Sequence, residues 1–228
     1  MIIFIGQVQQ GLQLLTHKLT KSPRSRDTLS DTDLPFFPKP KFFQQPVATA
    51  VTFYLCGEIK PAEDYVEWFQ ILRAAGETDI IYIRINSEGG DLFSALQLVR
   101  AIQESNATIV CSVEGICMSA ATLIFLSADR FELSDHTMFM FHNYSSGTIG
   151  KGGEMYDQIT HFRSWSEKLF DSFYKDFLTP EEIKSMLDNK DIWLDADEVA
   201  KRLEKRINAQ DTEETPKPKR TRKKTIDE

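Results

Sequence analysis

The sequence predicts an α/β fold, and three observations lead to this prediction. Short runs rich in β-branched residues, such as residues 80–85, alternate with longer segments whose apolar residues recur every three or four positions. Glycine, proline or serine separates most of these segments. The 228 residues leave room for one domain with a sizeable core and flanking tails. Strands and helices that alternate at this spacing predict β-α-β units with right-handed crossovers.

Residues 1–46 are the first of three predicted parts, an irregular arm rich in proline and phenylalanine. Four prolines lie between Pro35 and Pro46, and they exclude regular structure there. Four phenylalanines in the same stretch predict that the arm docks on its own domain or on a neighbouring subunit, and a disordered leader is the alternative. The apolar start, residues 1–5, lacks a basic lead and does not predict a signal peptide.

The second predicted part is the folded domain, residues 47–206. A strand over residues 47–55 precedes a helix that Pro61 opens, because proline favours the first helical position. The β-branched run at 80–85 predicts the next strand, and the pair Gly89-Gly90 predicts a turn at its end.

Asp91 is the predicted N-cap of the following helix, which has apolar residues on one face. A strand over 107–113 and a turn over 115–118 come next, and a short apolar helix over 119–127 follows that turn. The remaining strands of this half are predicted at residues 130–133 and 137–142.

One long predicted helix dominates the rest of the domain. A glycine-rich loop over 144–153 leads into a segment over 154–177 whose apolar and aromatic residues have helical spacing. Its length and aromatic content favour subunit contacts as well as core packing. Thr179 and the proline after it start another helix, and a strand over 192–194 precedes a last helix over 195–203.

The third predicted part, residues 207–228, is a charged, disordered tail. A net charge of -7 and a pI near 5.2 argue against a nucleic-acid or membrane surface over the whole chain, so nucleic acid or an acidic partner would bind only at the basic run from Pro216 to Lys224. No apolar run approaches the roughly 18 residues of a membrane span. The chain has three cysteines, Cys56, Cys111 and Cys117. Their spacing predicts buried thiols in a reducing compartment and no metal site, so we expect a cytoplasmic protein.

Three pieces of the central region carry residues suited to acyl transfer. A serine hydroxyl needs a neighbouring base, and the oxyanion that forms needs preorganised N–H donors. Ser119 begins a helix after a tight turn and His142 ends a strand, which makes them the candidate nucleophile and base. The N–H groups of Gly90 and Ala120 are the candidate oxyanion donors, because glycine permits close approach and helix N-termini have free N–H groups. Taken singly, each residue is also ordinary for a turn, a helix cap or a structural histidine.

Together these motifs resemble the proteolytic subunit of the ATP-dependent Clp protease. The matching residues are Ile85-Asn86-Ser87-x-Gly89-Gly90, Gly115-x-x-x-Ser119-Ala120-Ala121 and Met140-Phe141-His142-Asn143, followed by the glycine-rich loop and the long helix. The resemblance covers about residues 50–205. It implies a ClpP/crotonase-like fold with a protruding helix and a Ser-His-Asp triad in that chain order.

The resemblance assigns the catalytic and oxyanion roles to Ser119, His142, Gly90 and Ala120. It places the acid of the triad just before an aromatic strand, which here corresponds to residues 192–194. We predict Asp188 as this acid, with Asp191 as the main alternative and Asp195, or a site without an acid, as the others. Glu88 departs from the family pattern, because it stands in place of the usual proline.

The resemblance also implies an activity and an assembly. It implies a serine endopeptidase that cleaves peptides and unfolded proteins inside stacked heptameric rings, with a separate AAA+ unfoldase as the partner that uses ATP. The chain has no GxxxxGK[ST] phosphate loop of its own, and neither a metal nor an organic cofactor is implied. Two alternatives stay open. One is a crotonase-type acyl-CoA enzyme, and the other is an inactive ring-forming scaffold, which a carboxylate at Glu88 beside the oxyanion donors would favour.

Overall fold

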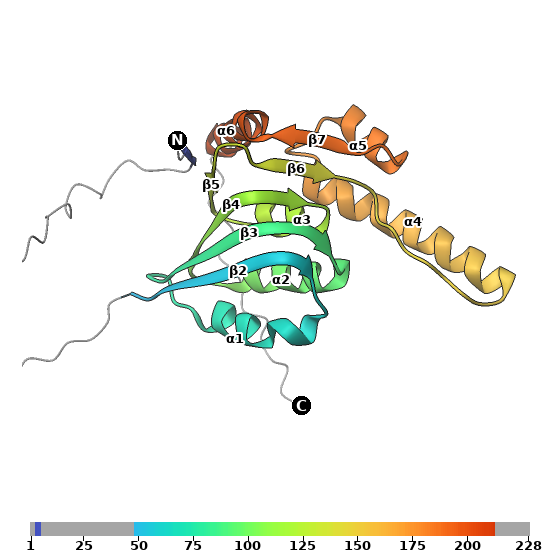
Figure 1. Ribbon diagram of the computed structural model, residues 1–228, viewed down its shortest axis with the longest axis horizontal. Coiled ribbons are helices and arrows are strands. Elements are labelled where there is room, and N and C mark those ends of the chain that lie inside the picture. The colour runs from blue at the N-terminus through green and yellow to red at the C-terminus, as the bar shows by residue number, and fades with distance from the viewer. Residues whose placement is uncertain (1–2, 6–47, 213–228) are drawn as a thin grey trace, which may run out of the picture. The chain divides into compact units, whose positions relative to one another are not determined.

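The computed structural model describes residues 3–5 and 48–212, which form a seven-stranded sheet with helices around it (Figure 1). The strands are β1 (Ile3–Ile5), β2 (Ala50–Ile59), β3 (Ile80–Gly90), β4 (Thr108–Met118), β5 (Arg130–Leu133), β6 (Met138–Phe141) and β7 (Ile192–Asp195). The helices are the 3-10 turn η1 (Ala62–Tyr65), α1 (Val66–Ala74), α2 (Leu92–Glu104), α3 (Ala120–Leu126), α4 (Gly152–Tyr174), α5 (Pro180–Leu187) and α6 (Ala196–Thr212). The predicted α/β class is confirmed.

Parallel pairing builds the centre of the sheet. Strands β2, β3, β4 and β5 lie side by side and run in the same direction. The first half of β4 pairs with β5 and its second half pairs with β6, also in parallel, while β1 and β7 add antiparallel edges. The carboxyl ends of β3, β4 and β6 therefore meet at one edge of the sheet, where Figure 1 shows their arrowheads side by side. Parallel sheets commonly place their functional residues at this edge.

Helices α1, α2 and α3 pack on one face of the sheet. Alternate residues of β3, such as Ile81 and Ile83, are fully buried on that face, while Tyr82 and Arg84 on the other face are half-buried. Every residue of α3 is buried, which explains why six of its seven residues are apolar, with Thr122 as the exception. The helix after Ser119 is therefore part of the core and gives the residues before it a rigid base.

Only the C-terminal half of the long helix α4 contributes to the core. Phe170 and Tyr174 are buried, whereas Tyr156 and Ile159 in the first half are exposed. Figure 1 shows this first half extending beyond the sheet. The helix ends at Tyr174, three residues before the predicted end.

Two predicted turns are extended strand instead. Gly89 and Gly90 belong to β3, where Gly90 pairs with Ile59 of β2, and residues 115–118 belong to β4. Both segments continue in extended form because strand partners lie beside them, β2 for the first and β6 for the second. The reversal of chain direction therefore comes later than predicted, at the single residue between each strand and the following helix, Asp91 or Ser119.

The ends of the chain also differ from the predicted parts. Residues 3–5, predicted to be irregular, pair with β5 as an edge strand, because three successive apolar residues suit that position. Helix α6 continues to Thr212, past the predicted domain boundary at 206. The rest of the predicted arm and the tail from 213 onward lie outside the described residues. Within residues 3–5 and 48–212, no helix has the length and apolar character needed to cross a membrane.

An ion pair joins α5 to α6 on either side of β7. The Nη1 and Nη2 groups of Arg202 donate to the two carboxylate oxygens of Glu182 at 2.7 and 2.9 Å. The Nε group of Arg202 donates to Glu198 at 2.8 Å. Hydrogen bonds from Arg202 are the main reason that the pKa of Glu182 is lowered from its ordinary value.

We expect Glu182→Gln to lower the free energy of unfolding by about 1 kcal/mol near pH 7. Because the folded-state pKa of Glu182 is lowered, its contribution is complete above the ordinary glutamate pKa of about 4.3 and is lost as the pH falls through the lowered value. The difference between wild type and variant should shrink in that acidic range, as measured by urea denaturation at a series of pH values. The exposed neighbour Glu181→Gln is the control. A difference that did not depend on pH would contradict the ion-pair explanation.

Candidate active site

Ser119 lies at the junction between β4 and α3, as the one residue between Met118 and Ala120. Its φ of 55° and ψ of -129° are rare for a residue with a side chain and cost about 1–3 kcal/mol. The Ser119 N–H donates to the carbonyl of Met140 at 2.8 Å. The Ser119 carbonyl accepts from the N–H and the hydroxyl of Thr122, at 3.0 and 2.6 Å. Hydrogen bonds on both sides therefore hold the strained turn.

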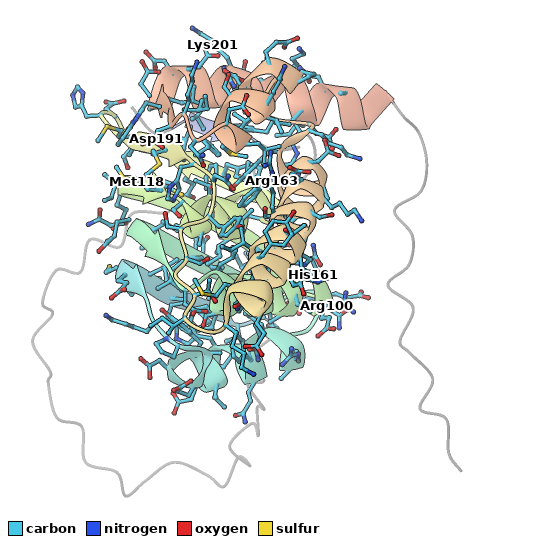
Figure 2. The ribbon with its side chains drawn as sticks, turned by 90° about the vertical axis from the view of Figure 1, so that its right-hand side faces the viewer. Arg100, Met118, His161, Arg163, Asp191 and Lys201 are labelled. Carbon is cyan, nitrogen blue, oxygen red and sulfur yellow. The ribbon has the colours of Figure 1, made fainter. Side chains whose placement is uncertain are left out.

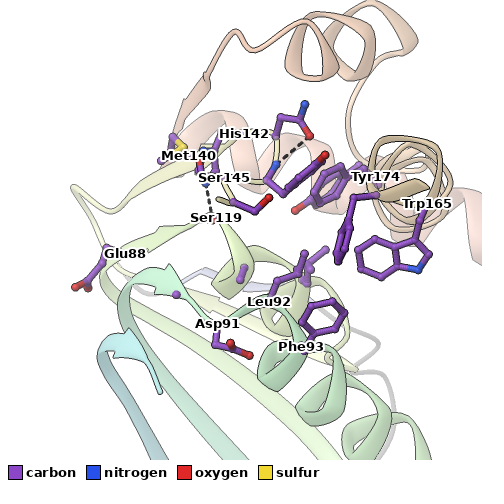
Figure 3. A pocket seen from close by; sticks show the side chains of 18 residues that line it. Glu88, Asp91, Leu92, Phe93, Ser119, Met140, His142, Ser145, Trp165 and Tyr174 are labelled. Carbon is purple, nitrogen blue, oxygen red and sulfur yellow. Dashed lines mark hydrogen bonds between the residues drawn. The ribbon is translucent and has the colours of Figure 1, made fainter. Parts of the chain in front are cut away.

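His142 follows β6 directly, and the parallel pairing of β6 with β4 brings it to Ser119. Met118 pairs with Met140, so the chain after β6 passes beside the turn after β4. The Nε2 atom of His142 lies 2.5 Å from Oγ of Ser119 (Figure 3). Both residues are half-buried. The structure thus brings the candidate nucleophile and the candidate base into direct hydrogen-bond contact, as general-base activation of a serine requires.

The two candidate oxyanion donors lie beside the serine. In the β2–β3 ladder the Asp91 N–H donates to the Ile59 carbonyl at 3.0 Å. Alternation along the parallel ladder turns the preceding N–H, that of Gly90, away from β2. Ala120 is the first residue of α3, where N–H groups have no partner within the helix. Gly90 and Ala120 both line the pocket that contains Ser119.

Ser119 and His142 open into a pocket of about 450 Å³ (Figure 3). Its aromatic wall consists of Phe93, Phe162, Trp165, Phe170 and Tyr174. Phe93 of α2 stacks on Trp165 of α4, with ring centroids 5.6 Å apart, so the two helices close the wall together. Glu88 lies at the mouth, and Figure 3 shows its carboxylate directed away from Ser119. A pocket of this shape can accept an apolar side chain next to the serine hydroxyl.

Three aspartates are candidates for an acid that orients His142, and the structure places them differently. No hydrogen bond joins the His142 ring to Asp188, Asp191 or Asp195, all of which lie within the described residues. Asp188 is the exposed residue that caps the C-terminus of α5. Asp195 pairs with Met138, at the end of β6 farther from His142. Neither of these two aspartates is placed by the sheet next to the histidine.

Asp191 has a different position. It directly precedes β7, in which Ile192 pairs with Phe141 of the antiparallel strand β6. The next pair of positions in this register is Asp191 opposite His142, and opposite residues in an antiparallel pair direct their side chains to the same face. Figure 2 shows Asp191 and Met118, the last residue of β4, on the same side of the view.

Sequence reasoning missed two polar residues that support the site. Thr122 gave no signal in the apolar run of α3, although it holds the Ser119 carbonyl. Asn143 was part of the histidine motif without a role of its own. Its Nδ2 group donates to the Leu187 carbonyl at 3.2 Å and to Oδ1 of Asn189 at 3.1 Å. Asn143 thereby ties the segment after His142 to the end of α5.

Other reactive residue types are poor candidates for the nucleophile or base. Burial raises the pKa of the Cys111 and Cys117 thiols, which keeps both protonated. His136 and His161 are exposed, the second on α4, as Figure 2 shows, and neither lines the pocket. The described residues contain no group of His, Cys, Asp and Glu arranged to hold a metal ion.

Comparisons with known proteins point to one family. The sequence model of the Clp protease family matches residues 49–202. The ATP-dependent Clp protease proteolytic subunit 2 of Pseudomonas aeruginosa is 30% identical over 146 residues, which cover 61% of this chain and 70% of that protein. A solved structure of a ClpP1 mutant from Listeria monocytogenes is similar with a TM-score of 0.53 and 25% identity, covering 66% of this chain and 86% of that chain.

Gly89 packs directly against the serine turn, and this contact generates a prediction. Its φ is 96°, and a Cβ atom at this position would lie 2.6 Å from Cβ of Ser119 and 2.8 Å from the Met118 carbonyl oxygen. We expect Gly89→Ala to displace Ser119 and to slow its reaction with a fluorophosphonate at least about tenfold. Gly153→Ala is the control, because nothing lies within 4 Å of its added Cβ. Unchanged labelling of a folded Gly89→Ala protein would show that the contact does not place the serine.

Proposed function

The chain belongs to the Clp protease family, and on that premise we propose that it hydrolyses peptide bonds with Ser119, His142 and Asp191 as a catalytic triad. The resemblance inferred from the motifs is thereby confirmed, and the chain is a ClpP-type serine endopeptidase. The single observation that best supports the assignment of roles is the 2.5 Å contact between Ser119 Oγ and His142 Nε2. The strained backbone of Ser119 also supports it, because strain of this kind clusters at active sites.

In the proposed reaction, Nε2 of His142 takes the Ser119 hydroxyl proton as Oγ attacks the carbonyl carbon of the substrate. The oxyanion that forms is held by the N–H groups of Gly90 and Ala120, and each such donor contributes roughly 3–4 kcal/mol to the stabilisation of the transition state. His142 then gives the proton to the leaving amine. Water attacks the acyl-enzyme with His142 as the base, which releases the second product and restores the serine.

We assign the triad acid to Asp191 rather than to Asp188, the residue favoured from the sequence. The β6–β7 register supports this choice, because extending it by one residue beyond its last pair, Phe141 with Ile192, sets Asp191 opposite His142. Cβ atoms of opposite residues in an antiparallel pair lie about 5 Å apart, so a carboxylate there can reach the ring after a side-chain rotation. Its role would be to hold Nδ1 protonated and to stabilise the imidazolium ion.

The two alternative functions gain no support from the site. A crotonase-type reaction has no need of the direct contact between Ser119 and His142. Glu88 was the feature that most favoured the scaffold alternative, but its carboxylate is directed away from Ser119 in Figure 3. This carboxylate is therefore poorly placed to oppose an oxyanion.

We also propose the assembly and the setting in which the peptidase acts. Family membership and the exposed apolar residues of α4, Tyr156 and Ile159, support a homo-oligomer of stacked, heptameric rings. Peptides and unfolded proteins are the proposed substrates, and an AAA+ unfoldase is the proposed partner that supplies them. All three cysteines are free thiols, which fits the reducing cytoplasm, although only Cys111 and Cys117 are buried as predicted and Cys56 is exposed.

A fluorophosphonate tests the proposed nucleophile. We expect one adduct, mapped to Ser119 by peptide mass spectrometry, and none in Ser119→Ala. The variant His142→Ala should react at least about 100-fold more slowly, because the hydroxyl has lost its base. Ser172→Ala, an exposed serine on α4, is the matched control and should react like the wild type. An assembled, folded protein that stayed unlabelled would refute the proposed chemistry.

Paired substitutions test the acid. Asp191→Asn should lower kcat/KM for a fluorogenic peptide at least about 100-fold, because an amide can hold His142 in the wrong tautomer. Asp188→Asn should change it by less than about threefold, since Asp188 caps the C-terminus of α5 and lies outside the β6–β7 ladder. Steady-state kinetics on both folded variants decide between them. If Asp188→Asn lowered kcat/KM more than Asp191→Asn did, Asp188 would be the acid of the triad.

A further inference from the structure

We propose that Thr122 and Tyr174 form a hydroxyl chain that positions the Ser119 turn for catalysis, an inference that rests on the proposed function. The Thr122 hydroxyl lies 2.6 Å from the Ser119 carbonyl oxygen, and the Tyr174 hydroxyl lies 2.7 Å from Oγ1 of Thr122. Tyr174 is the last residue of α4, and Thr122 is in the first turn of α3. The chain of hydroxyls therefore joins the end of the long helix to the backbone of the proposed nucleophile.

The direction of the hydrogen bonds follows from the number of protons. A threonine hydroxyl has one proton, and that of Thr122 is donated to the Ser119 carbonyl. Tyr174 must therefore donate its own proton to Oγ1 of Thr122. Donation to a hydroxyl polarises it and strengthens the bond that it makes in turn. The tyrosine hydroxyl thus tightens the hold on the Ser119 carbonyl.

The carbonyl that receives these bonds controls an oxyanion donor. The Ser119 carbonyl and the Ala120 N–H belong to one planar peptide unit, with the oxygen and the hydrogen on opposite sides. Fixing the oxygen against Thr122 therefore fixes the direction in which the Ala120 N–H points. The same bonds hold the ψ angle of Ser119 at its strained value of -129°. The hydroxyl chain thereby orients both the nucleophile and one of its proposed donors.

Burial makes this arrangement depend on the two side chains. Thr122 is 0% and Tyr174 1% exposed, so bulk water cannot take the place of a missing hydroxyl. The Tyr174 ring packs edge-on against Phe141, with centroids 5.3 Å apart, and stacks on Phe170. Phe141 directly precedes His142. Tyr174 therefore contacts the strand that leads to the proposed base and also donates to Thr122, which holds the Ser119 carbonyl. Burial is the main reason that the pKa of Tyr174 is raised, which keeps its hydroxyl a donor over the working pH range.

Removing only the hydroxyl groups distinguishes a positioning role of Thr122 and Tyr174 from a packing role. Tyr174→Phe keeps the ring and Thr122→Val keeps the shape of the threonine, so both variants leave the apolar contacts in place. If Tyr174 acts through Thr122, its hydroxyl has no effect once the threonine hydroxyl is gone. Two independent packing contributions would instead combine in the double variant.

The experiment measures steady-state peptide hydrolysis and fluorophosphonate labelling on the full-length, assembled protein. We expect Tyr174→Phe to lower kcat about tenfold with KM within about twofold of wild type, because the turn is misplaced but the pocket is intact. Thr122→Val should lower kcat about 100-fold, because the Ala120 donor loses its orientation. Thr122→Ser keeps the hydroxyl and should restore kcat to within about threefold of wild type. The double variant Thr122→Val/Tyr174→Phe should match Thr122→Val alone.

Tyr65→Phe is the matched control. Tyr65 is also buried, and its hydroxyl accepts from the Lys60 N–H at 3.1 Å, a bond that involves neither Ser119 nor Thr122. The hydroxyl chain would be overturned if Tyr174→Phe had the kcat of the wild type, or if the two losses in kcat multiplied in the double variant. Labelling of the wild type would still support the proposed function in either case. If Tyr174→Phe does not fold, comparing kcat of Thr122→Val with kcat of Thr122→Ser tests whether the threonine hydroxyl positions the turn. Equal kcat values in these two variants would overturn the inference. A wild-type protein without labelling would overturn the proposed function and this inference with it.

Discussion

The strained backbone at Ser119 is the constraint on which the rest of the site depends. A residue with a side chain does not adopt φ 55° and ψ -129° by itself, so neighbouring groups must impose it. The Met140 carbonyl holds the N–H of Ser119, and Thr122 holds its carbonyl. Gly89 lies so close to the turn that only a residue without Cβ fits beside it. Each of these contacts comes from a different element, and all of them converge on one residue.

The sheet supplies the frame for this convergence. Because β4 pairs with β3 on one side and with β6 on the other, the carboxyl ends of the three strands lie at the same edge of the sheet. The strand β3 brings the glycines, β4 brings the serine, and the histidine follows β6. The fully buried helix α3 follows the turn directly and fixes its C-terminal side in the core. The same topology that buries the core thus assembles the proposed catalytic groups at the edge of the sheet.

Helix α4 has two roles along its length. Its C-terminal half contributes Phe170 and Tyr174 to the core and part of the aromatic wall to the pocket. Its N-terminal half extends away from the sheet with exposed apolar side chains, which suits contacts between subunits of an assembly. One helix therefore connects the surface proposed for assembly to the residues beside Ser119, and the hydroxyls of Tyr174 and then Thr122 complete that connection.

Local sequence by itself determined the α/β class and most strands and helices, and the resemblance of its motifs to the Clp protease family paired Ser119 with His142. These follow from periodicity, from capping residues and from short motifs, all of which act over neighbouring residues. Two supposed turns, at Gly89-Gly90 and at 115–118, were misplaced because extension there depends on strand partners distant in sequence. The edge strand at residues 3–5 was missed for the same reason.

Tertiary structure alone decided what depends on register and on side-chain contacts across the fold. Asp188 and Asp191 are close in sequence, and the proposed choice of Asp191 depends on the pairing of β7 with β6, whose last pair is Phe141 with Ile192. Thr122 is unremarkable within an apolar helix until Tyr174, far along the chain, approaches it. Register and such contacts arise when distant segments pack together, and no local pattern of residues encodes them. The sequence therefore named Ser119 and His142 as the proposed nucleophile and base, while the packed structure determined how they are held.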